Sequence, residues 1–289
     1  MKAYVFPGQG SQKPGMGQNL YNEVLESRAL FKKANKILNF NITELMFEGT
    51  DEDLLQTKVT QPAIFIHSAI LALTSKTFAP DVCAGHSLGE FSALVASNAI
   101  SFEDGLKLVS IRANAMQKAC QDTNGTMAAI LGLSDEIIES SCSEIDGVVK
   151  PANYNCPGQL VISGEIKSVE KACEVLKEKG ARRALILPVS GAFHSELMSS
   201  AVNDLKKGIE ETDFSKPSCP IYQNFTGFPE EEPAKIKTNL LKQLTGAVLW
   251  NQTINRMIDD GVNEFYEVGP GNTLQAVSYT HLRAHETQF

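Results

Sequence analysis

Three features are scarce in this sequence of 289 residues: long apolar runs, positive charge and paired cysteines. No apolar run approaches the roughly 20 residues that a membrane-spanning helix needs, so we expect no membrane segment. Lys and Arg number 26 against 34 Asp and Glu, which gives a formal net charge of -8. Such a chain has little with which to neutralise a row of phosphates. The composition therefore argues against a nucleic-acid-binding or membrane-surface protein and favours small molecules or a locally docked protein as partners.

The six cysteines are scattered without any C-x-x-C pair, and no cluster of His, Cys and acidic residues has the spacing of metal ligands. Residues 1–6 read as a short strand, whereas a signal peptide would carry a basic region followed by a long apolar core. We therefore expect reduced thiols, no metal site and a cytoplasmic location.

The clearest chemical signal is the stretch Gly85-His86-Ser87-Leu88-Gly89-Glu90. It follows a short apolar run and precedes a helix-like segment, which is the order strand, tight turn, helix that a G-x-S-x-G nucleophile elbow needs. Glycines on both sides relieve crowding at a strained turn, and the serine is then presented at a helix N-terminus. The pattern predicts Ser87 as a nucleophile; a plain Gly-Ser turn is the structural alternative.

A nucleophilic serine needs a general base, and the sequence offers five histidines. Four of them lie in an atypical tail, in an apolar helical run or directly beside the serine: His281, His285, His67 and His86. By elimination His194, at a predicted strand-to-helix junction, is the best candidate for the base. Its alternative is a surface role at the start of that helix.

One arginine lies on the apolar face of a predicted helix that a capping box opens at Ser101. The residues three and four positions away from Arg112 are Leu108, Val109, Ala115 and Met116. A buried guanidinium without an anion costs several kcal/mol, so we expect a partner. The partner can be a protein carboxylate in a structural salt bridge or a substrate carboxylate held by two parallel hydrogen bonds.

The predicted order of strands and helices changes after Asn124. Strands are predicted at 126–133, 148–153, 159–163 and 182–189, with helices at 134–145 and 168–179. This is the β-α-β-β-α-β order of a ferredoxin-like unit. We therefore predict an α/β protein in which residues 125–189 form a small domain inserted in a larger α/β domain made of 1–124 and 190–277. Residues 278–289 lose the apolar periodicity, and we predict a non-native tail there.

Six motifs in register resemble the malonyl-CoA:acyl-carrier-protein transacylase family of type II fatty acid synthesis. They are residues 6–12, 85–90, Arg112, 153–158, 191–194 and 267–271, and the resemblance runs from Met1 to about Val277. It implies a large α/β-hydrolase-like domain with an inserted ferredoxin-like domain. It also implies a monomer that binds no cofactor and whose substrates are malonyl-CoA and the phosphopantetheinylated acyl carrier protein.

The resemblance also assigns roles to single residues. Ser87 would be the nucleophile and His194 its base, oriented by the backbone carbonyl of Gln243. The remaining roles are the oxyanion hole, at Gln9 and the amide of Leu88; the malonyl carboxylate clamp, at Arg112; and further substrate contacts, at Phe193, Asn153 and Asn155. Phe193 would leave no room for an α-methyl group. Residues 245–250 depart from the more usual asparagine-proline and arginine-tryptophan pattern of the family. The alignment of Gln243 is therefore supported by fewer matching neighbours than the alignment of the other site residues.

The implied reaction is a ping-pong acyl transfer that feeds fatty acid synthesis: Ser87 takes the malonyl group from malonyl-CoA and passes it to the carrier protein. Because that carrier is acidic, docking would need a basic patch, for which Lys177, Lys179, Arg182 and Arg183 are candidates. The alternatives are a trans-acting polyketide acyltransferase and a serine thioesterase or carboxylesterase that uses water. The hydrolase reading is weakened because no Asp or Glu occupies a recognisable triad position and a neutral ester gives Arg112 no role.

Overall fold

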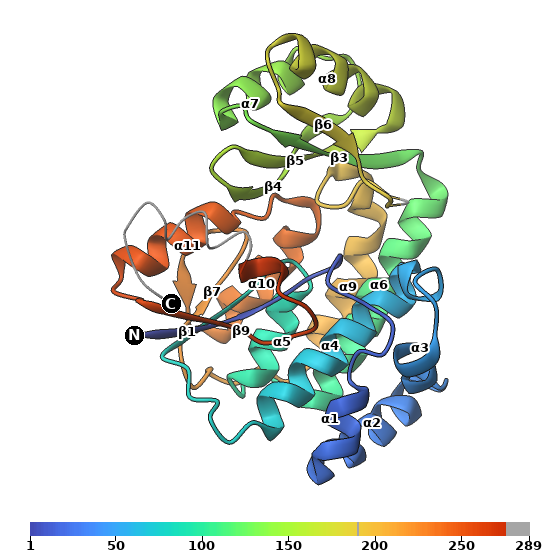
Figure 1. The fold of residues 1–289 in the computed structure, drawn as a ribbon, viewed down its shortest axis with the longest axis vertical. Coiled ribbons are helices and arrows are strands. Elements are labelled where there is room, and N and C mark those ends of the chain that lie inside the picture. Colours follow the sequence, from blue (N-terminus) through green and yellow to red (C-terminus); the bar gives the residue numbers. More distant parts are fainter. Residues whose placement is uncertain (190, 276–289) are drawn as a thin grey trace.

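The computed structural model describes residues 1–189 and 191–275, so the predicted tail at 278–289 lies outside the described residues. The chain forms a five-stranded sheet with the order β8-β7-β2-β1-β9 and a four-stranded sheet with the order β4-β5-β3-β6. Figure 1 shows the smaller sheet and its two helices at the top, above the larger sheet and most of the helices. The predicted α/β class is confirmed.

The larger sheet is parallel except at one edge. Its strands are β1 (Lys2–Phe6), β2 (Val82–Gly85), β7 (Ile221–Tyr222), β8 (Pro229–Glu230) and β9 (Glu264–Glu267), and only β8 runs antiparallel to its neighbour. Successive side chains of β1 enter opposite cores: Phe6 packs on one face of the sheet and Val5 packs with Trp250 on the other. Both faces are therefore buried, as is usual for parallel strands.

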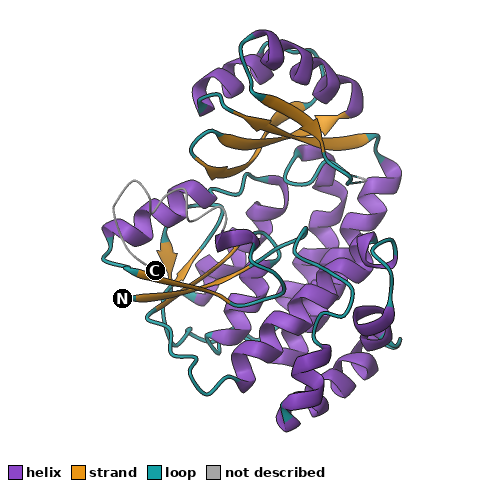
Figure 2. Cartoon of the chain, in the orientation of Figure 1, coloured by secondary structure: helices purple, strands orange, loops and turns teal. Residues whose placement is uncertain are grey.

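Helices cover both faces of this sheet (Figure 2). The first face carries α4 (Thr57–Thr74), α5 (Gly89–Ala96), α6 (Phe102–Asp122), α9 (Ser199–Glu210) and α10 (Pro233–Thr245). The second face carries α11 (Trp250–Asp259). The remaining short elements are α1 (Gln18–Glu23), α2 (Leu25–Leu38), α3 (Ile42–Glu48) and the 3-10 turns η1 (Asp53–Leu55) and η2 (Glu196–Met198). The predicted cap of α6 is present, since the Ser101 hydroxyl accepts from the Asp104 amide at 3.0 Å.

The smaller sheet is antiparallel throughout. Its elements are β3 (Gly125–Leu131), α7 (Asp135–Ser143), β4 (Val149–Cys156), β5 (Gln159–Glu165), α8 (Ile166–Glu178) and β6 (Arg183–Ile186), which is the predicted β-α-β-β-α-β order. Ile130 packs under α7 and α8, whereas its neighbour Ala129 belongs to the core of the larger part. Because successive side chains of a strand point to opposite faces, one face of the small sheet packs against its own helices and the opposite face packs against the larger part of the molecule.

Two backbone hydrogen bonds join the smaller sheet to the larger part of the molecule. The Tyr154 amide donates to Val248 O at 2.9 Å, and the Val248 amide donates to Ala152 O at 2.8 Å. Val248 lies in the short connection between α10 and α11, so edge strand β4 is fastened to the segment that directly follows α10.

The structure differs from the sequence-based predictions in several places. The strand expected at 182–189 ends at Ile186; the Leu187 amide still donates to Met127 O at 2.9 Å, and residues 187–189 line a cavity. Strand β8 lies in a Pro/Glu-rich segment for which no strand is predicted. The helix expected to begin near His194 begins only at Glu196, so the histidine lies in the preceding turn.

The turn between β2 and α5 is crowded by backbone. A Cβ atom on Gly89 would lie 2.1 Å from Phe6 O, and one on Gly85 would lie 1.9 Å from Gly89 C. Both contacts are to main-chain atoms, which cannot rotate away, so these positions require glycine.

We predict that Gly89→Ala destabilises the protein by about 3 kcal/mol or more, because the added methyl group must displace β1. The matched control is Gly158→Ala, a position with φ of 75° and no atom within 4 Å of the added carbon. There only the backbone strain remains, which costs about 1 kcal/mol. Urea unfolding of both variants measures the difference, and equal losses would contradict the crowding argument.

Candidate active site

Ser87 and His194 meet across the molecule. The Ser87 hydroxyl lies 2.8 Å from Nε2 of His194, although 107 residues separate them in the chain. Both residues have left-handed backbones, with φ of 52° and 60°. Non-glycine residues in this region carry strain that the surrounding structure must offset, and such strain concentrates at functional sites. The predicted nucleophile and the predicted base are thus brought into hydrogen-bonding contact by two strained turns.

The end of α10 orients the histidine. Nδ1 of His194 donates to Gln243 O at 2.9 Å and lies 3.2 Å from Gly246 O. The last carbonyls of a helix have no partner within the helix, so they are free to accept this bond. With its proton on Nδ1, His194 presents the lone pair of Nε2 to the serine hydroxyl. A backbone carbonyl therefore occupies the place that a carboxylate holds in a Ser-His-Asp triad.

Burial keeps this histidine neutral. His194 is 3% exposed, and burial, assisted by the positive charge of Arg112, lowers its pKa to about 3. The hydrogen bond to Gln243 O acts in the opposite direction but is outweighed. At neutral pH the imidazole is consequently free to accept a proton.

Arg112 contacts the Ser87 hydroxyl from the protein interior. It is 1% exposed, and its Nη2 donates to the Ser87 hydroxyl and to Gln243 Oε1, both at 3.1 Å. Its Nη1 donates to Gln61 Oε1 at 2.7 Å. Within the described ranges no carboxylate lies within 4 Å of it, and its Nε has no partner. Burial lowers the pKa of Arg112 to about 10, so it stays a cation. The direct salt bridge considered from the sequence is absent from the described part of the chain.

Two backbone amides near the serine are free to bind an oxyanion. Neither the Gln9 amide nor the Leu88 amide donates to another described residue. The side chain of Gln9 is held by Gln61, whose Nε2 donates to Gln9 Oε1 at 3.1 Å. Gln61 thus connects the predicted oxyanion residue to Arg112.

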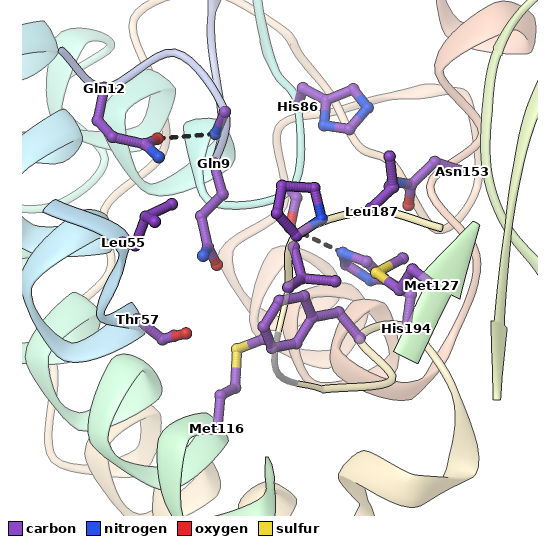
Figure 3. A pocket seen from close by; sticks show the side chains of 15 residues that line it. Gln9, Gln12, Leu55, Thr57, His86, Met116, Met127, Asn153, Leu187 and His194 are labelled. Atoms are coloured by element: carbon purple, nitrogen blue, oxygen red, sulfur yellow. Dashed lines mark hydrogen bonds between the residues drawn. The ribbon is translucent and has the colours of Figure 1, made fainter. Parts of the chain in front are cut away.

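A cavity of about 230 Å³ opens in front of the serine. Figure 3 shows the side chains of Gln9, Met116 and His194 arranged around it. Ser87, Phe193 and Asn153 also line it, and Oδ1 of Asn153 is buried without a partner among the described residues. The predicted residue Asn155 does not line this cavity; its Oδ1 lies 3.0 Å from Nε2 of His86. Arg112 and Gln243 likewise lie behind Ser87 and outside the lining.

Three residues near the site were not predicted: Gln61, Asn224 and Glu90. Asn224 holds the serine turn, since its Oδ1 accepts from the Ser87 amide at 2.6 Å and its Nδ2 donates to Gly85 O at 2.7 Å. Glu90 is buried and bonded to the Asn224 amide and to Gln243. No local pattern marks Asn224, because its partner is 137 residues away. Glu90 stands in the elbow motif itself, but that motif assigns it no chemistry.

Other site types are not represented in the described part of the chain. No helix there is long and apolar enough to cross a membrane. No group of three or more His, Cys, Asp and Glu is placed there to hold a metal ion. All six cysteines are buried and lie outside any disulfide, as expected for reduced thiols.

Comparison with known proteins places this geometry in a family. A family model described as an acyl transferase domain matches residues 3–288. The malonyl CoA-acyl carrier protein transacylase of Bacillus subtilis is 43% identical over 280 residues, which cover 95% of this chain and 88% of that protein. An acyl carrier protein S-malonyltransferase structure from Vibrio cholerae is 39% identical, with a TM-score of 0.93 and coverage of 98% and 94% of the two chains.

A third relative was solved with a carrier protein. The structure of a malonyl-transacylase in complex with its type II PKS acyl-carrier protein is 36% identical, with a TM-score of 0.94 over 98% of this chain and 93% of that one. The match of the family model to nearly the whole sequence, together with these identities, shows that the chain belongs to the acyl transferase family and that malonyl-CoA:acyl-carrier-protein transacylases are its relatives.

Proposed function

We propose that the chain moves a malonyl group from malonyl-CoA to the phosphopantetheine thiol of an acyl carrier protein, an activity of the EC 2.3.1.39 class. The observation that carries this assignment is the buried Arg112 guanidinium, which touches the Ser87 hydroxyl and has no protein carboxylate beside it. A cation in this position suits an acyl group that ends in a carboxylate. Membership of the acyl transferase family supports the same reaction.

In the first half of the reaction, Ser87 attacks the thioester carbonyl while Nε2 of His194 takes the hydroxyl proton. The amides of Gln9 and Leu88 bind the oxygen on which negative charge develops. The carbon–sulfur bond then breaks, His194 returns the proton to the CoA sulfur, and a malonyl-serine ester remains. The carbonyl of Gln243 keeps His194 in the correct tautomer throughout both transfers.

In the second half, the carrier thiol attacks the malonyl-serine ester. His194 takes the thiol proton and returns it to the Ser87 oxygen as the ester bond breaks. The two half-reactions use the same groups, so CoA and the carrier must leave and enter in turn. This is a ping-pong mechanism, and it needs no bound cofactor.

The acyl group is selected by residues around the cavity. The malonyl carboxylate would replace the neutral partners of Arg112 on its Nη atoms, and the free Nε supports a further bond. Phe193, which is 6% exposed and lines the cavity, fills the space that an α-methyl group would need. Asn153, with its unpartnered Oδ1, is the nearer of the two predicted asparagines to the substrate; Asn155 would act only by orienting His86.

The alternative to fatty acid synthesis is supply of a polyketide carrier in trans. One relative was solved with a type II PKS carrier protein, and the chemistry of the malonyl-serine ester is the same for both acceptors. A hydrolase that uses water is less well supported, because the third member of the serine site is a carbonyl and the buried cation has no role with a neutral ester.

Two further parts of the proposal concern the domain architecture and the oligomeric state and location of the protein. The strand order of the small sheet and its two helices fit a ferredoxin-like unit at 125–189, inserted in an α/β-hydrolase-like unit made of 1–124 and 190–277. We also propose that the protein acts as a monomer in the cytoplasm, which suits its six reduced cysteines.

Intact mass after brief exposure to malonyl-CoA tests the function directly. Wild-type protein should gain one malonyl group and Ser87→Ala none, because the ester forms on that hydroxyl. Adding phosphopantetheinylated carrier protein should discharge the adduct, whereas water alone should discharge it slowly. Rapid loss to water would favour a hydrolase, and an adduct on Ser87→Ala would remove the serine from the mechanism.

Arg112→Ala should lower the rate of malonylation by on the order of 100-fold, since a substrate carboxylate would then enter a buried site without its cation. Transfer of an acetyl group, which has no carboxylate, should fall far less. Arg112→Lys is the control that keeps the charge but loses the paired geometry. The ratio of malonyl to acetyl transfer, measured by mass, should collapse in the alanine variant; an unchanged ratio would refute the clamp.

The carrier docking surface is proposed at β6. Arg182 and Arg183 are exposed there, with exposed Leu185 and Ile186 beside them, and the chain continues from this strand into the cavity lining at 187–189. Lys179 is already engaged, because its Nζ lies 3.5 Å from Glu144 and donates to Ser141 at 2.9 Å. Of the four predicted basic residues, the two arginines are therefore the best placed to meet an acidic partner, and Lys177 is secondary.

Arg183→Glu should slow transfer to the carrier by roughly 10-fold at low salt, because a like charge then faces the acidic partner. It should leave malonylation by malonyl-CoA unchanged. Lys171→Glu on α8, whose Nζ pairs with Glu174 at 3.2 Å, is the control charge reversal. Both half-reactions can be followed by mass, and equal effects of the two reversals on carrier transfer would place the docking surface elsewhere.

A further inference from the structure

A single buried carboxyl group lies beneath the serine, the histidine and the arginine. Glu90 is 1% exposed and lies in the first turn of α5, three residues after Ser87. Among the described residues no Lys or Arg nitrogen lies within 4 Å of it. Its two oxygens instead contact two N–H donors: the backbone amide of Asn224 at Oε1, and Nε2 of Gln243 at Oε2, the latter at 2.8 Å. Burying an acidic group with only these partners is costly, so its presence calls for a reason.

The two donors belong to the residues that hold the reacting groups. The side chain of Asn224 accepts from the Ser87 amide at 2.6 Å. Gln243 presents its backbone oxygen to His194 and its side-chain Oε1 to Arg112. Glu90 touches neither the cavity nor a reacting atom, but it is bonded to both residues that do the positioning.

The orientation of the Gln243 amide depends on what stands at position 90. Its Nε2 donates to Glu90 and to Ser87 O at 3.0 Å, so the Oε1 end of the same amide faces Arg112 and accepts from its Nη2. If the amide turned over, its NH2 group would face the guanidinium, donor against donor. An acceptor at position 90 therefore fixes the orientation that suits Arg112.

Glu90 and Arg112 also influence each other electrostatically. Burial raises the pKa of Glu90 to about 8, because it outweighs the two N–H donors and the positive charge of Arg112, which lower it. In return, Glu90 is the acidic group that raises the pKa of Arg112. The other titratable groups of the site, His86 and His194, are kept neutral by burial. Glu90 and Arg112 are separated by the Gln243 amide, which bonds to both and leaves the guanidinium without a directly paired carboxylate among the described residues.

We propose that Glu90 is a positioning residue that fixes the Gln243 amide and the Asn224 backbone, and through them the serine, the histidine and the arginine. This inference rests on the proposed function for its effect on malonyl transfer. Its effect on the serine itself is independent of the acyl group.

The test is Glu90→Gln, which keeps the size of the side chain but replaces one acceptor by a donor. That donor must face either the Asn224 amide or Nε2 of Gln243 unless Gln243 turns over, and turning over deprives Arg112 of its acceptor. We expect malonylation to slow by on the order of 100-fold, as for small displacements of reacting groups. Glu90→Asp keeps the carboxylate but shortens the side chain by one methylene group, so we expect it to be faster than Glu90→Gln and slower than wild type. The control is Glu165→Gln in the small sheet, whose carboxylate also accepts a backbone amide, from Val148 at 3.3 Å, and which should leave the rate unchanged.

A double-mutant cycle separates positioning from a merely structural role. If Glu90 acts through the Gln243 side chain, Glu90→Gln should cost much less in a Gln243→Ala background, which retains the backbone carbonyl. The same fold-loss in both backgrounds would overturn the proposal. So would a Glu90→Gln variant that is malonylated at the wild-type rate, or a Glu90→Asp variant no faster than Glu90→Gln.

A fluorophosphonate probe that reacts with activated serines gives a readout free of the malonyl group. Glu90→Gln should slow its reaction with Ser87 when the variant has the circular dichroism and thermal midpoint of folded protein. If wild-type protein reacts with the probe but transfers no malonyl group, the proposed function fails while the role of Glu90 is still measured. Equal probe rates for wild type and Glu90→Gln would overturn that role.

Discussion

A guanidinium held away from water without a carboxylate beside it is the constraint around which this site is arranged. The groups that hydrogen-bond to Arg112 are two amide oxygens and a hydroxyl, which give its two Nη atoms partners but do not balance its charge. The positive charge lowers the proton affinity of His194 and prepares the site for an anion. The cost of burying it must be offset by the packing of α4, α5 and α6 around it.

This constraint also explains why a backbone carbonyl stands behind the histidine. A carboxylate at that place would compete with the proposed substrate carboxylate for the positive charge of Arg112. A carbonyl at the end of α10 orients the imidazole equally well and carries no charge. Gln243 therefore serves twice, with its main chain toward the base and its side chain toward the cation. Glu90, a buried acid, is separated from the guanidinium by the Gln243 side-chain amide.

Local patterns were enough to predict the elements that hold the site. Each of these patterns spans only a short stretch of sequence, and the structure contains the elements that they predict. They are the glycines around Ser87, the capping box at Ser101 and the order of strands and helices in 125–189. Elimination among the histidines led to His194, and the resemblance led to Gln243 despite the unusual sequence that follows it. Strand β8 was missed because proline and glutamate disfavour strands, and only pairing with β7 overrides that preference.

The groups that sequence reasoning did not find are those whose role is defined by a distant partner. Asn224 and Gln61 are ordinary polar residues until the fold places them against Ser87 and Arg112. Glu90 is only three residues from Ser87 in sequence, but its bond to Gln243 depends on α10, because Gln243 lies 153 residues later in the chain. Only tertiary structure carries this information.

The long separations in the chain have a consequence for biosynthesis. Ser87 leaves the ribosome 107 residues before His194, and the carbonyl that orients the histidine follows 49 residues later still. Until α10 has emerged, a nascent chain holds a serine with neither a positioned base nor a complete anion site. The contact between Ser87 and His194, together with the carbonyl that orients the histidine, can therefore form only after residue 243 has been added to the chain.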